Sequence, residues 1–295
     1  MEGRTRSRLI GIVAMPAFAA CAIASVAASV GTAQQRGVFA LLGGTQKIAS
    51  RLWVNHAAGL SVTLNVRQFA VGAPAPGKEP TPIFDYEIDM QKLMHLVVVR
   101  DDFATFAHLH PTFDPKTGTF SQRFTKQPNH RYYIYADTTP RGIGQQVFRF
   151  TIESDGPLAL RRPATASAAT SFVAPYSVTI SGTTLPANQA RTLGLTILER
   201  GRPATDLSTY LGAAAHAVFI NTATLTYVHL HPMVGGSQTM AMGANMEMSG
   251  NAKPQAGPHL QMTVPALPAG IYRLWIEFSG ANNRVYTAPF TVLVH

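Results

Sequence analysis

The stretch Met94–Pro111, MHLVVVRDDFATFAHLHP, holds two apolar runs on either side of Arg100-Asp101-Asp102-Phe103. Short runs rich in Val and Phe predict strands, and Asp tolerates the left-handed backbone of tight turns, so the stretch predicts a β-hairpin. The stretch Ala215–Pro232, AHAVFINTATLTYVHLHP, repeats the arrangement. In both, a lone His is followed thirteen residues later by His-Leu-His-Pro. Six of the chain's ten histidines therefore fall in one pattern that occurs twice.

The hairpin register decides where the histidines lie. If Asp101-Asp102 forms the loop, His95 faces His108 directly and His110 lies diagonally opposite on the same face. Facing Cβ atoms are about 5 Å apart and diagonal ones about 7–8 Å. Three imidazoles placed in this way can converge on one metal ion at about 2.0–2.1 Å. A slip of one residue would send His95 to the opposite face.

The second copy predicts the same geometry. With Thr222-Ala223 as the loop, His216 faces His229, and His231 is diagonal to it. The histidine faces also carry apolar residues, so we expect each triad at the end of an apolar face, near the rim of the core. These apolar residues are Val97, Val99 and Phe106 in the first copy and Val218, Ile220, Leu225 and Tyr227 in the second.

Histidines on strands can also form an exposed polar face, or bond to carbonyls inside a core. The two 18-residue stretches share only seven identities, and three of these are the histidines. The triad has persisted while the rest of the hairpin changed, which favours a metal site. Neutral imidazoles suit Cu(II) or Zn(II).

The repeat extends beyond the hairpins and indicates the fold. The two triads are 121 residues apart, and the downstream run RYYIYAD aligns with IYRLWIE. Tyr135 then matches Trp275, and Asp137 matches Glu277. Short runs rich in Val, Ile, Phe and Tyr alternate with turn residues at a spacing of about 8–12 residues, as in sandwiches. We predict an all-β fold: two tandem immunoglobulin-like antiparallel β-sandwich domains after an N-terminal signal segment.

The domain boundaries follow from changes in residue composition and periodicity along the chain. Residues 34–57 show no clear period, and a short helix packed on the first domain is one interpretation. The predicted parts are a signal peptide at 1–33, this N-terminal segment at 34–57, the first sandwich at 58–154, a linker rich in Pro, Ala, Ser and Thr at 155–171, and the second sandwich at 172–295.

The N-terminus predicts export. Arg4, Arg6 and Arg8 precede an apolar run that ends in small residues, which is typical of a signal peptide cleaved after Ala33. The alternatives are an uncleaved membrane anchor and a lipoprotein attached through Cys21. We expect a periplasmic or secreted bacterial protein that contacts a membrane only through such an uncleaved leader or lipid anchor.

Composition excludes several classes of function. Cys21 is the only cysteine, so cleavage leaves no disulfide, no thiolate metal site and no cysteine nucleophile. The formal net charge is +9, but the basic residues are scattered, with no helix-turn-helix or RNA-binding pattern. We therefore expect no nucleic-acid partner.

A methionine-rich segment follows the second hairpin. It lies among Gly, Ser and Asn, which predicts a loop, and it holds half of the ten methionines. Thioethers are soft ligands that select Cu(I), so the segment favours copper over zinc, although its methionines could instead cover the edge of the sandwich. The residues are Met233, Met240, Met242, Met246 and Met248, of which the last four are the predicted Cu(I) ligands.

The remaining candidates are weaker. His259 and Met262 follow the methionine segment and could complete its site, whereas Met94 should point away from His95 because neighbouring strand residues alternate. His56, His130 and His295 are interpreted as incidental.

The motifs resemble a known group of proteins. MHLVVVRDD…FAHLHP with YADTTPRG, and YLGAAAHAVFI…YVHLHP with YRLWIEF, are similar to exported bacterial proteins with paired His-x-His-Pro sandwiches, to YtkA-like domains and, more distantly, to CopC-like copper-binding sandwiches. The resemblance covers about residues 58–153 and 172–295. It implies a role in copper or heavy-metal handling and no established reaction. The longer methionine insert of the second copy leaves open whether both sites have the same role.

Three functions are therefore compared. The first is a copper carrier or buffer, not an enzyme, with Cu(II) at the His triads, Cu(I) at the methionine segment and a copper transporter or acceptor protein as partner. The second is a zinc hydratase or hydrolase with a three-His site, for which no Glu or Ser stands out as a proton shuttle. The third is a structural or adhesive sandwich pair without metal.

Overall fold

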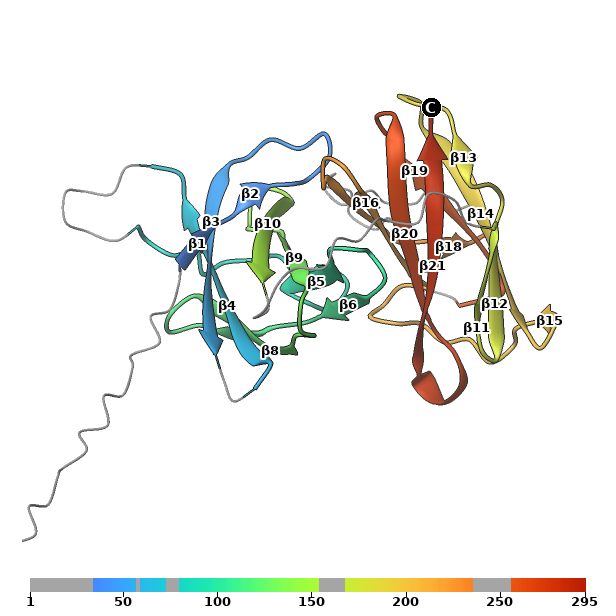
Figure 1. Cartoon of the computed structure of the whole chain (residues 1–295), viewed down its shortest axis with the longest axis horizontal. Coiled ribbons are helices and arrows are strands. Elements are labelled where there is room, and N and C mark those ends of the chain that lie inside the picture. The colour runs from blue at the N-terminus through green and yellow to red at the C-terminus, as the bar shows by residue number, and fades with distance from the viewer. Residues whose placement is uncertain (1–33, 57–58, 73–79, 154–167, 236–255) are drawn as a thin grey trace, which may run out of the picture. The chain divides into compact units, whose positions relative to one another are not determined.

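The chain is almost entirely β-structure in the part that the computed structural model describes, which is residues 34–56, 59–72, 80–153, 168–235 and 256–295. These residues form four sheets of five, five, six and five strands and one short 3-10 helix, η1 (Ala281–Asn283). Strands pair antiparallel, except that β13 runs parallel to β21 (Figure 1). The predicted all-β fold of tandem sandwiches is confirmed. None of the helical structure in these residues is long and apolar enough to cross a membrane.

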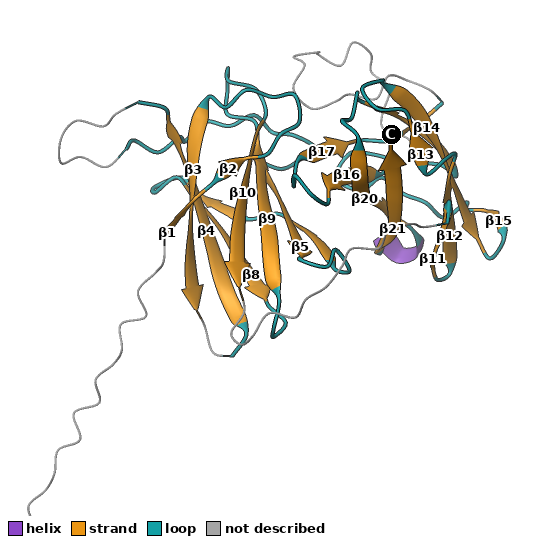
Figure 2. Ribbon diagram, turned by 45° about the horizontal axis from the view of Figure 1, so that its top comes forward, coloured by secondary structure: helices purple, strands orange, loops and turns teal. Residues whose placement is uncertain are grey.

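Two sheets make up the first sandwich (Figure 2). One has the order β1 (Gln34–Arg36), β3 (Ile48–His56), β4 (Ser61–Ala70), β8 (Thr119–Thr125) and β7 (Thr112–Asp114). The other has the order β2 (Val38–Phe39), β10 (Gln146–Glu153), β9 (Arg131–Thr138), β5 (Met94–Arg100) and β6 (Phe106–Leu109). The first histidine hairpin is β5–β6, at one edge of the second of these sheets.

The second sandwich has the same plan. One sheet has the order β11 (Thr170–Val173), β12 (Tyr176–Ile180), β14 (Arg191–Glu199), β19 (His259–Val264) and β18 (Met233–Val234), with β15 (Arg202–Pro203) paired to β14. The other has the order β13 (Thr184–Leu185), β21 (Val285–Val294), β20 (Gly270–Ser279), β16 (His216–Asn221) and β17 (Tyr227–Leu230). The second histidine hairpin, β16–β17, again lies at the edge of its sheet.

The helical interpretation of residues 34–57 is wrong, because this segment forms three strands. β3 alternates between buried and partly exposed residues, which is the period of a strand, and it pairs with β4 along its whole length. β1 pairs with β3 and β2 pairs with β10, so the segment reaches both sheets of the first sandwich. The first sandwich therefore begins before residue 58.

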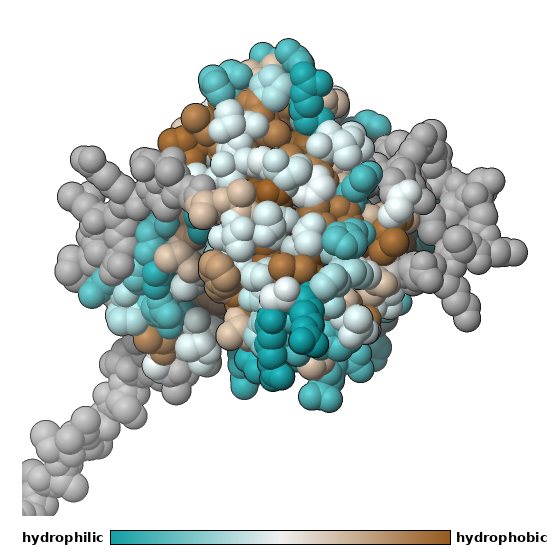
Figure 3. Space-filling model, turned by 90° about the vertical axis from the view of Figure 1, so that its right-hand side faces the viewer, coloured by the Kyte–Doolittle hydropathy of each residue, from teal (hydrophilic) through white to brown (hydrophobic). Residues whose placement is uncertain are grey.

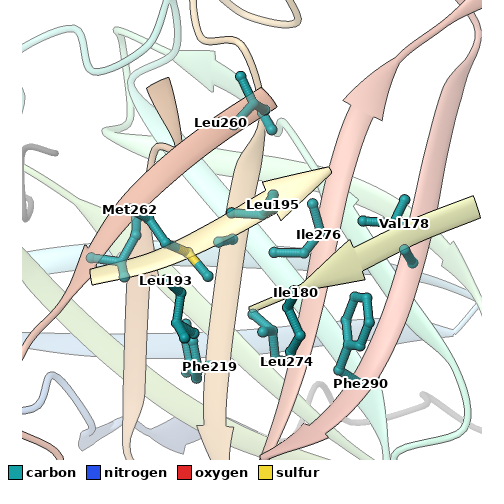
Figure 4. Close-up of a cluster of buried hydrophobic side chains, with 14 of the residues drawn as sticks. Val178, Ile180, Leu193, Leu195, Phe219, Leu260, Met262, Leu274, Ile276 and Phe290 are labelled. Carbon is teal, nitrogen blue, oxygen red and sulfur yellow. The ribbon is translucent and has the colours of Figure 1, made fainter. Parts of the chain in front are cut away.

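Each sandwich has its own apolar core. In the second sandwich, side chains from β12, β14, β16, β19, β20 and β21 converge between the two sheets, as Figure 4 shows for Phe219, Leu260, Met262 and Phe290. In the first, Leu96 and Val98 of β5 pack with Leu64 of β4 and other buried residues. Burial of this apolar area from water is the main stabilising term of each domain.

A third apolar cluster joins residues of both repeats. It contains Val97 and Val99 of β5, Tyr135 of β9, Tyr227 of β17 and Trp275 of β20, together with other buried side chains. Because neighbouring strand residues point to opposite sides, β5 faces the sandwich core with Leu96 and Val98 and this cluster with Val97 and Val99. Both sides of β5 are therefore buried, which explains its unbroken apolar run.

The expected place of the triads at the rim of a sandwich core is wrong for this reason. The histidine face of each hairpin belongs to the third cluster, on the opposite side of the sheet from the sandwich core. An apolar run on both faces of a strand cannot tell which face is the interior of its own domain.

The outer surface carries scattered apolar residues. On the face shown in Figure 3, hydrophobic residues form small groups among pale and polar ones. Such isolated residues are normal on folded proteins. The large exposed ones are Val38, Val71, Phe84, Ile88, Phe172, Val285 and Leu293.

Candidate metal centre

The first hairpin has a different register from the predicted one, and the difference is two residues. Val97 pairs with His108, so Asp101-Asp102 is not the two-residue loop. The turn instead has Phe103 in the left-handed region at φ 55°, with its N–H bonded to the carbonyl of Arg100. Asp102 accepts two hydrogen bonds from the Arg100 guanidinium and one from a backbone N–H, which stabilises the wider turn. A shift of two residues preserves the face, so the three histidines still lie on the same side.

The second hairpin shows the same shift, since Val218 pairs with His229. Leu225 takes the left-handed conformation at φ 60°. The Asn221 side-chain oxygen accepts hydrogen bonds from the backbone N–H groups of Ala223 and Thr224. Asn in this role favours a longer turn than the predicted Thr222-Ala223 loop.

Each hairpin brings its three histidines together. One nitrogen from each of His95, His108 and His110 lies within 4.8 Å of the other two, and the same holds for the second set. In the first triad the ring centroids are 5.1, 5.2 and 4.8 Å apart. In the second the distances are 5.4, 4.8 and 4.8 Å. The first triad is His95, His108 and His110, and the second is His216, His229 and His231.

Hydrogen bonds at the outer side fix the ring protons of the first triad. His95 Nε2 lies 3.1 Å from the carbonyl oxygen of Asp89, and His108 Nδ1 lies 2.7 Å from Glu277 Oε2. Carbonyl and carboxylate oxygens only accept hydrogen bonds, so these two ring nitrogens carry the protons. His95 Nδ1 and His108 Nε2 then face each other with lone pairs at 2.9 Å. Two lone pairs at this distance repel each other unless a cation binds both.

The second triad repeats these contacts. His216 Nε2 lies 3.0 Å from the carbonyl oxygen of Tyr210, which stands 121 residues after Asp89. His229 Nδ1 lies 3.4 Å from Asp137 Oδ2. His216 Nδ1 and His229 Nε2 face each other at 3.2 Å. The carbonyl, the paired nitrogens and the carboxylate therefore recur in both copies.

The third histidine of each triad has a buried nitrogen without a hydrogen-bond partner. These atoms are Nε2 of His110 and Nε2 of His231. Leaving a buried polar atom unpaired costs about 1–3 kcal/mol, unless a ligand satisfies it. With the paired nitrogens, they complete a three-nitrogen set in each copy, which fits a transition-metal ion.

Burial keeps the imidazoles of His95, His110, His216, His229 and His231 neutral. It lowers the pKa of His95, His216 and His229 well below the ordinary value of 6.5, and neighbouring histidines lower it further. Burial, followed by the nearby His108, lowers the pKa of His110 and of His231 to about 3. A proton is therefore a poor occupant of the gap between the facing nitrogens. Neutral imidazole is the form that binds metals.

Three acidic side chains lie beside the histidines. Burial raises the pKa of Asp137 to about 8, although Gln145 donates a hydrogen bond of 2.9 Å to it. Burial raises the pKa of Asp89 to about 6. The third is Glu277, whose second oxygen accepts a hydrogen bond from Thr287 at 3.2 Å.

Asp137 and Glu277 are the site residues that the sequence interpretation missed. The alignment of the two repeats matches Asp137 with Glu277, and this match was the sequence signal that could have pointed to them. Their contacts cross between the repeats: Glu277 of the second reaches His108 of the first, and Asp137 of the first reaches His229 of the second. The sequence indicated no nearby Glu or Ser, but Glu277 lies beside His108, because sequence spacing within one hairpin does not show contacts between the repeats.

The two triads adjoin each other. His95 lies 6.1 Å from His216 and 5.3 Å from His229 between ring centroids. His108 lies 5.4 Å from His216 and 5.3 Å from His229. These separations resemble those inside each triad, so all six histidines lie in one cluster.

Several predicted residues lie elsewhere. Met94 packs in the first sandwich core, on the opposite side from His95 as predicted, and Met262 packs in the second core. His259 is exposed on β19, 3.4 Å from Thr196 Oγ1. His130 is buried and bonded to Asp101 at 3.0 Å. Met240, Met242, Met246 and Met248, the leader with Cys21, and most of the predicted linker lie outside the described residues.

Comparisons with known proteins give a family and distant similarities to solved structures. A family model described as "Domain of unknown function (DUF8832)" matches residues 55–156 and 171–295, so each matched segment holds one triad. A search of curated proteins gives no match. A red sea bream transglutaminase has 10% identity and a TM-score of 0.22, and the match covers 85% of this chain and 32% of that chain. The chain thus spans about a third of that structure, and a likeness at this TM-score carries no argument.

Proposed function

The chain belongs to the family described as Domain of unknown function (DUF8832), and we propose that this member is an exported metal-binding protein that carries or buffers copper. Its metal ligands are the six histidines of the two triads. The basic and apolar leader pattern of the first 33 residues supports export.

The observation that carries the proposal is the pair of facing nitrogens in each triad. Protons on the outer nitrogens of His95 and His108 leave two lone pairs 2.9 Å apart in a buried place. Burial disfavours a proton between the two nitrogens, and two buried hydrogen-bond acceptors in contact are unfavourable unless a ligand satisfies them. A metal ion satisfies both lone pairs and also the free Nε2 of His110.

The separation of the nitrogens favours copper. With metal–nitrogen bonds of about 2.05 Å, a nitrogen separation of 2.9 Å corresponds to an angle of about 90° at the metal. Tetragonal Cu(II) has such angles, whereas tetrahedral Zn(II) has angles of about 109°. The 3.2 Å separation in the second triad gives about 103°, which is nearer to the tetrahedral angle, so the angular argument for copper applies to the first triad. Met240, Met242, Met246 and Met248 would add a softer Cu(I) site.

The zinc-enzyme alternative has one supporting feature, the carboxylates that hold histidines, as in many zinc sites. Burial supports it less, because a hydratase or hydrolase needs an open coordination position for water and substrate. Five of the six histidines are buried, and only His110 is partly exposed. A carrier or buffer needs no substrate access at the metal.

The experiment is metal analysis of the full chain purified from medium that contains copper and zinc. We expect bound copper and a rise in melting temperature when copper is added to metal-free protein. The variant His95→Gln with His216→Gln should lose both effects, whereas His56→Gln, a change at the exposed histidine at the end of β3, should keep them. Zinc together with hydratase or hydrolase activity would favour the enzyme, and no bound metal would contradict the proposal.

A further inference from the structure

We infer that the two triads form a single dinuclear centre, in which two metal ions share one buried compartment. The inference rests on the proposed metal binding and concerns its organisation. Two separate sites, one in each domain, would behave as independent carriers. A shared compartment makes the two ions neighbours that influence each other's binding and electronic state.

The first observation concerns the four inner histidines, which are the two of each triad that lie against the other triad. His95 and His108 of the first triad lie 5.3–6.1 Å from the two inner rings of the second, His216 and His229. Ring centroids within one triad are 4.8–5.4 Å apart. Rings at these separations are in contact, which leaves no room for a layer of other side chains between the triads.

The outer two histidines show that the cluster holds two ligand sets and not one. The ring contacts of His110 are with His95, His108 and Tyr210. Those of His231 are with His216 and His229. Among the ring contacts of the described residues, neither outer ring stacks on a ring of the opposite triad, although His231 lies near His108. Each triad also has its own pair of facing nitrogens, so the donor atoms divide into three and three.

Two acidic side chains make contacts between the two repeats at the histidine cluster. Glu277 of the second repeat accepts a hydrogen bond from His108 of the first at 2.7 Å. Asp137 of the first repeat lies 3.4 Å from His229 of the second. His108 is thus held by a carboxyl group of the other repeat, and His229 lies beside one. Such partners of ligating histidines set the orientation of the ring.

Charge balance is consistent with two ions. Two divalent cations in a buried compartment need compensating negative charge nearby. Asp89, Asp137 and Glu277 supply three carboxyl groups at this cluster. The Oδ2 atoms of Asp89 and Asp137 are buried and have no hydrogen-bond partner, although they lie 4.0 Å from His95 Nε2 and 3.4 Å from His229 Nδ1.

The test is a Cu(II) titration of metal-free full chain, followed by metal analysis and quantitative electron paramagnetic resonance. We expect two coppers per chain and a strongly reduced or exchange-broadened signal, because neighbouring Cu(II) ions couple their unpaired electrons. Two coppers with the full signal of two isolated ions would overturn the dinuclear centre, and so would one copper per chain. Those results would leave metal binding intact, whereas no bound copper would contradict the proposed function as well.

A variant sharpens the test. His231→Gln removes an outer ligand of the second triad only, so one copper should be lost and the remaining ion should give the full signal of about one spin per chain. The matched control His56→Gln, at an exposed histidine at the end of β3, should retain two coupled ions. If His231→Gln gives a coupled two-copper signal, the division into two ligand sets is wrong. Circular dichroism checks that both variants keep the β-fold, and the wild-type titration decides the inference if they do not.

Discussion

The two triads have the same ligand plan and different surroundings. In the first, His108 donates to Glu277 at 2.7 Å, and His110 is partly exposed. In the second, His229 lies 3.4 Å from Asp137, and His231 is only 3% exposed. Glu is one methylene longer than Asp, so it reaches its histidine while the shorter side chain stops short. The comparison indicates that the first triad is more tightly oriented and more accessible, and the second more deeply enclosed.

The largest expected effect is acid instability of the metal-free chain, to which the second triad contributes more. A histidine with a lowered folded-state pKa is neutral when folded, so below about pH 6.5 the unfolded chain binds more protons and stability falls as the pH falls. The pKa is lowered for three histidines of the second triad and for two of the first. Each contributes up to about 1.4 kcal/mol per pH unit.

Two carboxyl groups act in the opposite direction. The raised pKa values of Asp137 and Asp89, about 8 and about 6, mean that the folded chain binds more protons than the unfolded chain between those values and about 3.9. Stability from these groups rises as the pH falls. Five histidines against two carboxyls leave a net loss of at most about 4 kcal/mol per pH unit near pH 5. Urea unfolding at pH 7, 6 and 5 measures it, and equal stability at all three would refute the buried neutral state.

A smaller expected effect is a difference in metal affinity between variants of Glu277 and variants of Asp137. Loss of a carboxylate that orients a ligating histidine typically costs 10–100-fold in metal affinity. Glu277→Gln should show a loss in this range, because its bond to His108 is short, and Asp137→Asn should show less, because its contact is long. Competition with a chelator under matched conditions measures both affinities. An equal or larger loss for Asp137→Asn would reverse the proposed difference between the triads.

The contrast between the hairpins and their partners shows what the sequence can reveal. The apolar run that contains Leu96, Val97 and Val98 predicted a strand. The predicted turn was wrong, but the triads still form because a register shift of two residues preserves the face. The contacts of Asp137 and Glu277 could not be predicted, since they depend on how one repeat packs on the other. Residues 34–57 were misjudged because β1 and β2 are short, and because β3 buries Ser50 and leaves Trp53 partly exposed, which blurs its alternation of apolar and polar residues.

The smallest expected effect concerns the access of a chemical reagent to the outer histidines, His110 and His231. His110 is partly exposed, whereas His231 is buried, so a histidine-modifying reagent such as diethyl pyrocarbonate should label His110 first in metal-free protein. Copper should protect it, because the reagent needs a free ring nitrogen. Peptide mapping by mass spectrometry at short reaction times gives the order. Faster labelling of His231 would show that the second triad opens more readily and would invert the comparison.

The central claim is that the histidine triads bind copper through their ring nitrogens. X-ray absorption at the copper edge of the loaded full chain tests it most directly. The account predicts about three nitrogen neighbours per copper at about 2.0 Å, with the outer-shell scattering that imidazole rings produce. It also predicts that the variant His95→Gln with His216→Gln loses this pattern. A first shell of oxygen atoms without imidazole scattering, or a spectrum that this variant leaves unchanged, would contradict it.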